Sequence, residues 1–480
     1  MTSAAGAWQI PCYLEAHGGR LFMEGIDLVN LAQARGTPLY VYSARRIAET
    51  ARGLRRAFEA HHPGAIICYA SKALSAIKAL RLIRAEGLSI EANSDGELFR
   101  ARKAGFAPNK IILNGVSKSD NELRAALSPP IKAINVDSLF ELSRIITVAR
   151  SLGQRARIAL RIVPEVDSPT SPGNRTGSET TKFGIRRSEL PDAIRTIKEA
   201  GDEVIMVGVH AHIGSQIVDT APYKSAAITL SALFLDIRHQ LGHRLDHINI
   251  GINIGGGFPL TYMRGAKSSP RGDIFCPNID FEEIAEAVMP LLRERLGPEV
   301  EVILEPGRRL VGDSAVMLSR VENIKDRSDG HWLYLDAGYN VLVESYTYKW
   351  YYHALTANKL AERTAPFRVV GPLCDNGDAF FDVDGEQTVE RLLRARPAFV
   401  GERELLESAL IRLPRRRHLA ESTGPGDLIA FLDAGAYTLD QFTLNNGRLR
   451  PEVGLIRPDG GYELIRRRDS FEDLLHNEVI

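Results

Sequence analysis

Lys72 is a candidate for chemistry because it stands where an apolar run ends and a helix-like run begins. Residues 66–70 suit a buried strand, and residues 75–85 carry apolar side chains at helical spacing. In an eight-stranded β/α barrel, strands end at the functional rim, where a lysine amine shielded from water can lose its proton and become a nucleophile. Lysines after strands are usually solvated, so this position needs support from other residues.

Two histidines follow another strand-like run. His210 and His212 point to one side of an extended chain, because side chains alternate along a strand. No third ligand with recognisable spacing accompanies them, so the sequence predicts no metal site. An imidazole could instead stack on an aromatic cofactor while the Ser215 hydroxyl binds an anion. Two hydrogen-bonded core histidines are the structural alternative.

Three glycines follow the strand-like run at 247–254. An acidic residue ends the next run, at 300–305, and an arginine comes shortly after it. Gly255, Gly256 and Gly257 lack Cβ atoms, so their N–H groups can converge on a phosphate, although a tight turn needs the same residues. Glu305 could keep a heterocyclic nitrogen protonated, and Arg308 could grip a phosphate or a substrate carboxylate. A surface ion pair between the two is the alternative. No GxxxxGK[ST] or GxGxxG pattern indicates a nucleotide.

A cysteine lies among turn residues later in the chain. Cys374 belongs to the stretch 371–378 and is followed by the carboxylates of Asp375 and Asp378. Tyr437 follows a strand-like run at 428–432. A cysteine alone is more often inert than catalytic, so Cys374 is a catalytic candidate only in combination with the residues above.

The composition excludes several classes of function. The 480 residues include 60 Lys and Arg and 60 Asp and Glu, so no net charge draws the chain to nucleic acid or to an anionic membrane. The four cysteines are widely separated, which indicates a reducing, cytoplasmic setting rather than disulfides. No signal-like or membrane-spanning apolar stretch occurs. We therefore expect a cytoplasmic protein with a small-molecule ligand.

Strand-like and helix-like runs alternate up to about residue 305, and this alternation must position the candidates. About nine strand-like runs occur, at 39–42, 66–70, 89–92, 111–114, 133–136, 158–163, 204–212, 247–254 and 300–305. The pattern predicts an α/β fold with a (β/α)8 barrel over residues 36–310. Short runs between Gly, Pro and Asp turns predict a β-sandwich or β-barrel domain built from residues 1–35 and 311–480.

An arginine-rich segment at about 387–418 interrupts the predicted β domain. It combines leucines at helical spacing with the cluster Arg415-Arg416-Arg417. A solvated surface insertion is the simpler interpretation, and recognition of an anionic partner or of an acidic substrate tail is the alternative.

Eight short motifs, in one order and spread over nearly the whole chain, resemble a known enzyme family. The motifs are YASKAL, SDGEL, KFGI, HIGSQI, GGGFP, EPGR, GPLCDNGD and DAGAYT. The set resembles the alanine-racemase-like fold of pyridoxal phosphate enzymes, and within it the diaminopimelate and ornithine decarboxylase family. HIGSQI with GPLC favours the diaminopimelate branch.

The resemblance implies roles for the candidates. Lys72 would hold pyridoxal 5'-phosphate as a Schiff base, His212 would stack on its ring, and Glu305 would face the pyridine nitrogen. The phosphate would be held by Ser215, Gly255, Gly256, Gly257 and Tyr437, with Arg308 near it or near the substrate. Cys374 would reach the active site of the other subunit of a homodimer, and it or a nearby water would protonate the α-carbon after carbon dioxide leaves.

Several positions depart from the family pattern. After the Asp336-Ala337-Gly338 stretch, Glu344 stands where diaminopimelate decarboxylases carry an arginine for the distal carboxylate, whereas Tyr348 matches a family tyrosine. Asp375 follows the cysteine, as in the ornithine type. In the barrel, Asn253 and Glu91 each replace an aspartate.

The substrate pocket is therefore predicted to include Arg308, Asp336, Glu344, Tyr348 and Asp375 and to accept an amino acid with a cationic or polar distal group. The alternatives are a true meso-diaminopimelate decarboxylase, a decarboxylase of a conjugated or siderophore-type amino acid, an amino-acid racemase, and a non-catalytic carrier of the cofactor.

Overall fold

The computed structural model describes residues 11–166, 177, 181–242, 251–263, 273–277 and 279–479. The chain divides into two compact units. The first, here the barrel unit, comprises Ile47–Thr261 and Ser269–Val311. The second, here the strand-rich unit, comprises Met1–Arg46, Tyr262–Ser268 and Gly312–Ile480.

Eight parallel strands close the barrel in the order β10-β11-β12-β5-β6-β7-β8-β9. The strands are β5 (Ala65–Ala70), β6 (Ser89–Ala92), β7 (Ile111–Leu113), β8 (Ala133–Val136), β9 (Ala156–Arg161), β10 (Val204–His210), β11 (Gly251–Asn253) and β12 (Glu301–Leu304). Apolar side chains such as Ile112, Val207 and Ile303 form a buried cluster among them. Polar residues take over where the strands end, which makes those ends the place for chemistry.

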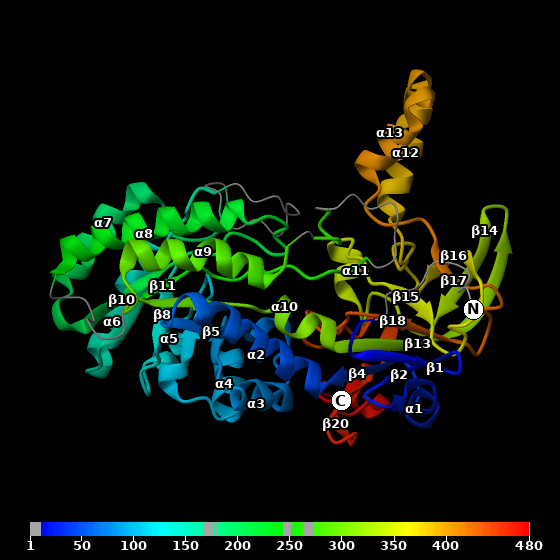
Figure 1. Ribbon diagram of the computed structural model, residues 1–480, viewed down its shortest axis with the longest axis horizontal. Helices are drawn as coiled ribbons and strands as arrows, with labels where there is room; N and C mark the ends of the chain where they lie inside the picture. The colour runs from blue at the N-terminus through cyan, green and yellow to red at the C-terminus, as the bar shows by residue number, and fades with distance from the viewer. Residues whose placement is uncertain are drawn as a thin grey trace. The chain divides into compact units, whose positions relative to one another are not determined.

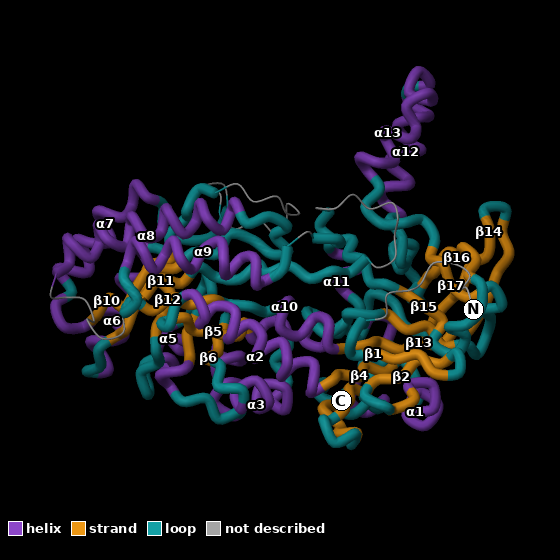
Figure 2. The backbone as a smooth tube through the Cα atoms, viewed as in Figure 1, coloured by secondary structure: helices purple, strands orange, loops and turns teal. Residues whose placement is uncertain are grey.

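Helices precede, separate and follow the barrel strands, and Figure 2 shows them in purple around the orange strands. They are α2 (Ala44–His61), α3 (Ile77–Ala85), α4 (Asp95–Lys103), α5 (Asp120–Ala126), α6 (Leu139–Leu152), α7 (Leu190–Glu199), α8 (Ala221–Leu241), α9 (Phe281–Leu296) and α10 (Arg308–Val311). Ser94, Ser119, Ser138 and Asp280 each accept a backbone N–H at the third helical residue. These caps fix the helix starts directly after the strand-end loops.

The barrel prediction is confirmed, with one strand misplaced. The run at 39–42 forms β4 (Leu39–Ser43), which pairs with β13 (Ala315–Arg327) and β19 (Glu452–Ile456) in the strand-rich unit. All five β4 residues are buried, so the run looks like a barrel strand although its partners lie far along the chain. The barrel therefore starts at β5, and its unit begins at Ile47 rather than at residue 36. Residues 247–250 of another expected strand lie outside the described residues.

A mixed sheet organises the strand-rich unit, in the order β17-β16-β14-β13-β4-β19-β20, with β15 and β18 joined through β13. The remaining strands of this sheet are β14 (Gly330–Leu335), β15 (Ala354–Thr356), β16 (Thr364–Val370), β17 (Arg417–Ala420), β18 (Leu428–Phe431) and β20 (Tyr462–Arg466). A small sheet of β1 (Leu14–His17), β2 (Arg20–Met23) and β3 (Ile26–Asp27) precedes α1 (Leu28–Arg35). Leu21, Leu28, Val316 and Ala430 belong to the shared core.

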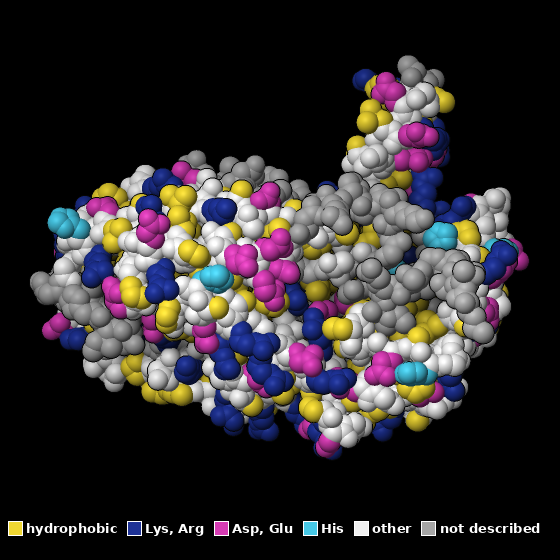
Figure 3. Space-filling view, viewed as in Figure 1, with side chains coloured by type: hydrophobic (Ala, Val, Ile, Leu, Met, Phe, Trp, Pro, Cys, Tyr) yellow, Lys and Arg dark blue, Asp and Glu magenta, His cyan; other side chains and the backbone are white. Residues whose placement is uncertain are grey.

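The arginine-rich segment folds as a helical arm of the strand-rich unit, drawn in orange in Figure 1. It comprises α12 (Val383–Ala395), a 3-10 turn (Pro397–Glu402) and α13 (Arg403–Leu410). Acidic and basic side chains lie side by side on its surface (Figure 3). Arg403 pairs with Glu390 at 2.6 Å, and Arg415 pairs with Glu407 at 2.9 Å.

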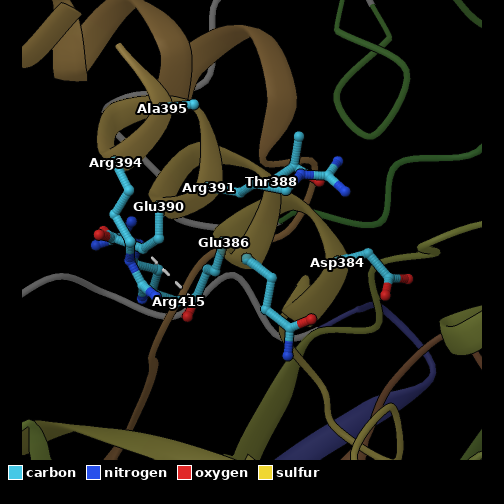
Figure 4. Close-up of a pocket in the computed structure, with 9 residues that line it drawn as sticks. Asp384, Glu386, Thr388, Glu390, Arg391, Arg394, Ala395 and Arg415 are labelled. Carbon is cyan, nitrogen blue, oxygen red and sulfur yellow. Dashed lines mark ion pairs between the residues drawn. The ribbon is translucent and has the colours of Figure 1, made fainter. Parts of the chain in front are cut away.

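An open groove of about 1030 Å³ runs along this arm. Figure 4 shows Arg394, Glu390 and Arg415 drawn together on one side of α12, with Arg391 and Asp384 pointing elsewhere. The mixture of charges agrees better with a solvated insertion than with a dedicated anion site.

Candidate active site

Lys72 lies at the carboxyl end of β5, in the 3-10 turn Ser71–Ala73. The end of β5 is tied to the loop after β12, because Ala70 N–H donates to Pro306 O at 3.1 Å. Ser71 Oγ donates to Glu97 Oε2 of α4 at 2.9 Å, which anchors the turn on its other side. Ser71 and Ala73 are buried, whereas Lys72 is exposed. The single chain therefore places the lysine as predicted but does not supply the expected shielding from water.

His212 lies just beyond the end of β10 and carries a defined tautomer. Gly256 N–H donates to His212 Nδ1 at 3.1 Å, so Nδ1 is the unprotonated nitrogen. Burial lowers the pKa of His212 well below its usual value, and the nearby charges of Lys72 and Arg161 lower it further. The ring is therefore neutral at physiological pH, which suits stacking on a flat cofactor.

The three glycines make a turn that no other residue fits without a backbone shift. A Cβ on Gly255 would lie 2.6 Å from Ala211 O, one on Gly256 would lie 2.2 Å from Glu305 O, and one on Gly257 would lie 2.6 Å from Gly214 O. Gly255 and Gly257 also have φ of +70° and +96°. The turn thus has a structural role, because backbone oxygens from neighbouring segments approach all three glycines too closely for a side chain.

Ser215 and Arg308 lie next to each other on this side of the barrel. Arg308 Nε donates to Ser215 Oγ at 3.5 Å, and the Arg308 residue is 5% exposed. A hydroxyl, a guanidinium and a glycine turn at the ends of neighbouring strands form a cradle suited to a phosphate group. Sequence reasoning predicted these residues, and the structure brings them together.

Glu305 follows β12 and is surrounded by donors. Asn253 Nδ2 donates to Glu305 Oε1 at 2.7 Å, Asn114 Nδ2 lies 3.3 Å from both carboxylate oxygens, and His210 Nε2 lies 3.4 Å from Oε2. Burial alone would raise the pKa of Glu305, but His210 and Asn253 outweigh burial and lower it to about 2. Glu305 is therefore an ionised carboxylate that can hold a heterocyclic nitrogen in its protonated form.

Two polar residues of this interior were missed by sequence reasoning. Asn114 follows β7 and donates to Glu91 Oε1 at 2.7 Å as well as approaching Glu305. Arg161 ends β9, lies 3.6 Å from Asp137 Oδ1, and has its Cζ 4.4 Å from the Phe183 ring centroid. The sequence feature that could have identified both residues is a polar side chain at the end of an otherwise apolar run.

The cysteine loop of the strand-rich unit is exposed but well tethered. Cys374 N–H donates to Asn446 Oδ1 at 2.8 Å, and Asp375 Oδ2 accepts from Tyr339 Oη at 2.8 Å. Asp378 accepts the N–H groups of Tyr339 and Leu373, each at 2.8 Å. Asp375 is thereby held next to the segment that precedes α11 (Val343–Thr347).

The other predicted substrate residues have different surroundings. Glu344 in α11 is 3% exposed, whereas Tyr348 is 38% exposed. Asp336 Oδ1 accepts from Ser319 Oγ at 2.6 Å and from Arg320 N–H at 2.9 Å, so this carboxylate connects two strands. Tyr437 lies in the loop after β18 with φ of +56°, a conformation often found at functional loops.

The structure thus groups the candidates into two sets. Those of the barrel unit, Lys72, His212, Ser215, Gly255, Gly256, Gly257, Glu305 and Arg308, gather at the ends of β5, β10, β11 and β12. Those of the strand-rich unit are Asp336, Glu344, Tyr348, Cys374, Asp375 and Tyr437. Within the described ranges, no cluster of three or more His, Cys, Asp or Glu residues is suited to a metal ion. Similarly, no helix among the described residues is long and apolar enough to span a membrane.

The closed parallel barrel, with a lysine, a neutral histidine and a buried carboxylate at its strand ends, agrees with the class of pyridoxal phosphate enzymes that the sequence motifs resemble. Residues 45–312 match the model of the pyridoxal-dependent decarboxylase family, pyridoxal binding domain. The chain therefore belongs to this family and is a pyridoxal-phosphate-dependent decarboxylase, a carboxy-lyase.

Relatives resemble the chain over almost its full length. It is 32% identical to the diaminopimelate decarboxylase of Aquifex aeolicus, with 96% of each chain covered. The enzyme of the same name from Methanothermobacter thermautotrophicus is also 32% identical, over 96% of each chain. A crystal structure of diaminopimelate decarboxylase from Methanocaldococcus jannaschii superposes with a TM-score of 0.81 at 29% identity, covering 98% of both chains. The predictions of fold, cofactor and enzyme class are confirmed.

Proposed function

We propose that the protein removes the α-carboxylate from a free amino acid whose distal end is cationic or polar. The observation that carries the choice of substrate is the pair of carboxylates Glu344 and Asp375 in the segments where the family resemblance places distal-group recognition. A distal ammonium is attracted by these charges, and a distal carboxylate is repelled.

The barrel residues support the choice of reaction. Bound pyridoxal phosphate acts as an electron sink for the bond that breaks at the α-carbon. Lys72 is the residue that would hold it, with Ser215 and Arg308 on the phosphate. Glu305, as an ionised carboxylate, would keep the ring nitrogen protonated, and neutral His212 would stack on the ring without adding a competing positive charge.

A homodimer is part of the proposal. Cys374 is exposed in the single chain, and so is Lys72. The partner subunit's Cys374 would supply the proton that replaces carbon dioxide at the α-carbon, and the partner surface would shield Lys72 from water. The expected result by analytical ultracentrifugation is a dimer, and a Cys374→Ala variant should retain the cofactor while losing about 10² in turnover or more.

Asp375 is exposed and fixed in position, which supports recognition of an ammonium group. Asp375 is fixed by Tyr339 Oη and by Gly377 N–H, both at 2.8 Å, so its position does not depend on substrate. Tyr339 in turn packs against Tyr346 of α11, with ring centroids 4.7 Å apart and the ring planes tilted by 30°. The segments that carry Glu344 and Asp375 are thus packed together within the strand-rich unit.

A second candidate is meso-diaminopimelate itself, whose distal end carries both an amine and a carboxylate. The observation in its favour is the name shared by relatives with 32% identity over 96% of the chain. The replacement of the family arginine by Glu344 argues against it, because the distal carboxylate then lacks its cation.

The deciding experiment measures carbon dioxide released by the purified protein, saturated with cofactor, from the D and L forms of ornithine, lysine and arginine and from diaminopimelate. We expect release from a basic amino acid. A Glu344→Arg variant should shift the preference toward diaminopimelate by about tenfold or more, with Glu344→Gln as the matched uncharged control. Activity on diaminopimelate alone, at a kcat/KM of roughly 10⁴ M⁻¹s⁻¹ or more, would refute the proposed substrate class.

A further inference from the structure

The carboxamide of Asn253 joins the glycine turn to Glu305. Asn253 ends β11 and is 3% exposed. Its Oδ1 accepts from Gly255 N–H at 2.9 Å, and its Nδ2 donates to Glu305 Oε1 at 2.7 Å. A backbone N–H can only donate, so the amide oxygen must face Gly255 and the amide nitrogen must face the carboxylate. These two contacts fix the orientation of the side chain.

A second amide presents its nitrogen to the same carboxylate. Asn114 Nδ2 lies 3.3 Å from both oxygens of Glu305 and donates to Glu91 Oε1 at 2.7 Å. Asn135 Nδ2 donates to Asn114 Oδ1, which orients this amide from its other side. Asn114 and Asn135 are both buried. Glu305 is therefore approached by two buried amide donors whose directions are set by other residues.

These donors favour the ionised form of Glu305. The residue is buried, and burial without donors favours the uncharged form of a carboxyl group. Hydrogen bonds donated to a carboxylate favour its charged form and are stronger than hydrogen bonds between neutral groups. Asparagine amides do not titrate, so both donors remain whether or not His210, whose Nε2 lies 3.4 Å from Glu305 Oε2, carries a second proton.

The glycine turn does not need the donor of Asn253. Gly255 N–H requires only an acceptor, and an aspartate oxygen would serve it equally well. The same aspartate would replace the nitrogen that lies 2.7 Å from Glu305 Oε1 by a second oxygen. Two carboxyl oxygens at that distance share a proton, which converts Glu305 from an anion into half of an acid pair. The nitrogen of Asn253 therefore acts on Glu305 and not on the turn.

We propose that Asn253 is a positioning residue, with Asn114 as a second donor, that holds Glu305 unprotonated and oriented for the ring nitrogen of pyridoxal phosphate. An ionised carboxylate stabilises a protonated ring nitrogen, whereas a carboxyl group that shares a proton with its neighbour stabilises it less. The inference deepens the proposed function and rests on it, since it requires Glu305 to face that nitrogen.

The ring nitrogen itself reports the effect of Asn253. Protein loaded with 15N-labelled pyridoxal phosphate is compared at pH 7 by nuclear magnetic resonance. We expect the wild-type signal at the protonated position and the Asn253→Asp signal shifted by roughly half or more of the separation toward the unprotonated position. Asn121→Asp is the matched control and should resemble the wild type, because Asn121 is exposed in α5 and gains the same charge. A wild-type signal in Asn253→Asp overturns the proposal, since a residue that only holds the turn would leave the ring nitrogen unchanged.

Infrared spectroscopy of the cofactor-free protein gives a second measurement, which does not depend on cofactor binding. We expect a carboxylic acid carbonyl band in the Asn253→Asp minus wild-type difference spectrum at pH 7, from the proton shared with Glu305. Asn114→Asp, at the second donor, should show a band of the same kind. The exposed carboxyl of Asn121→Asp should be ionised and show none. Absence of the band from both Asn253→Asp and Asn114→Asp overturns the proposal.

Glu305→Gln separates this inference from the proposal on which it rests. A glutamine has no charge to hold the ring nitrogen protonated, so the 15N signal should move to the unprotonated position. If the signal does not move in Glu305→Gln, Glu305 does not act on the ring nitrogen, and both proposals fail. A signal that moves in Glu305→Gln but not in Asn253→Asp refutes only the role given to Asn253.

Discussion

Replacing Glu91 by glutamine should make the protein less sensitive to rising pH. The folded-state pKa of Glu91 is about 8, raised from 4.5 mainly by burial. In the unfolded chain this carboxyl loses its proton near pH 4.5, whereas in the folded chain it keeps the proton until about pH 8. Between these values the folded state binds more protons, so the free energy of unfolding falls as pH rises.

The size of the effect follows from the same pKa values. Each pH unit well inside the window costs about 1.4 kcal/mol, and because the slope falls off near both pKa values, the interval from pH 5 to pH 8 costs the wild type about 3.5 kcal/mol relative to Glu91→Gln. Glutamine keeps an acceptor for Asn114 Nδ2 and never ionises. At pH 5 both side chains are neutral, and the two proteins should have similar stability.

Urea unfolding of the cofactor-free protein, monitored in parallel for wild type and variant at half-unit pH intervals, measures this difference directly. Contributions from titrating groups that do not interact with Glu91 cancel when the two curves are subtracted. Glu301→Gln provides the control, because it removes a carboxyl of the same size from the same barrel but not from the Asn114 pair. A difference between wild type and Glu91→Gln that stays flat from pH 5 to pH 8 would refute the assignment of the proton to Glu91.

Two further substitutions probe the barrel. Gly256→Ala places a Cβ 2.2 Å from Glu305 O, so we expect cofactor affinity to fall about tenfold or more in an absorbance titration. Gly424→Ala is the control and should bind cofactor normally, because its Cβ meets nothing within 4 Å. Unchanged binding in Gly256→Ala would contradict the phosphate cradle. Lys118→Met removes the 2.6 Å partner of buried Glu141 and should cost about 3–5 kcal/mol in urea unfolding, and adding Glu141→Leu should recover part of that loss. A cost below about 1 kcal/mol would show that Glu141 finds another partner or becomes neutral.

Much of the barrel and its site could be predicted because the information is local in the sequence. Lys72, His212 and Glu305 each follow an apolar run directly, and the glycine turn has its own signature. β4 was placed wrongly because its five buried residues fit a barrel strand, and only its partners β13 and β19 identify its true sheet. The burial pattern of a strand indicates which of its faces is buried, but it does not indicate which strands pair with it.

The proton on Glu91 and the role of Asn114 could not be predicted from the sequence. Asn114 contacts Glu91, 23 residues earlier, and Glu305, 191 residues later. These contacts exist only after the barrel closes, so no spacing in the chain encodes them. The exposure of Lys72 was likewise unexpected, because shielding depends on more than the strand and turn that position the lysine.

The position of β4 has a consequence for synthesis of the chain. Its residues leave the ribosome before any barrel strand, yet one partner, β19, begins at Glu452 and is made roughly 400 residues later. The barrel can close while β4 still has both edges unpaired, and such edges invite pairing with other chains. A nascent chain arrested before β13 is made should therefore be prone to aggregate through β4, even after its barrel has closed.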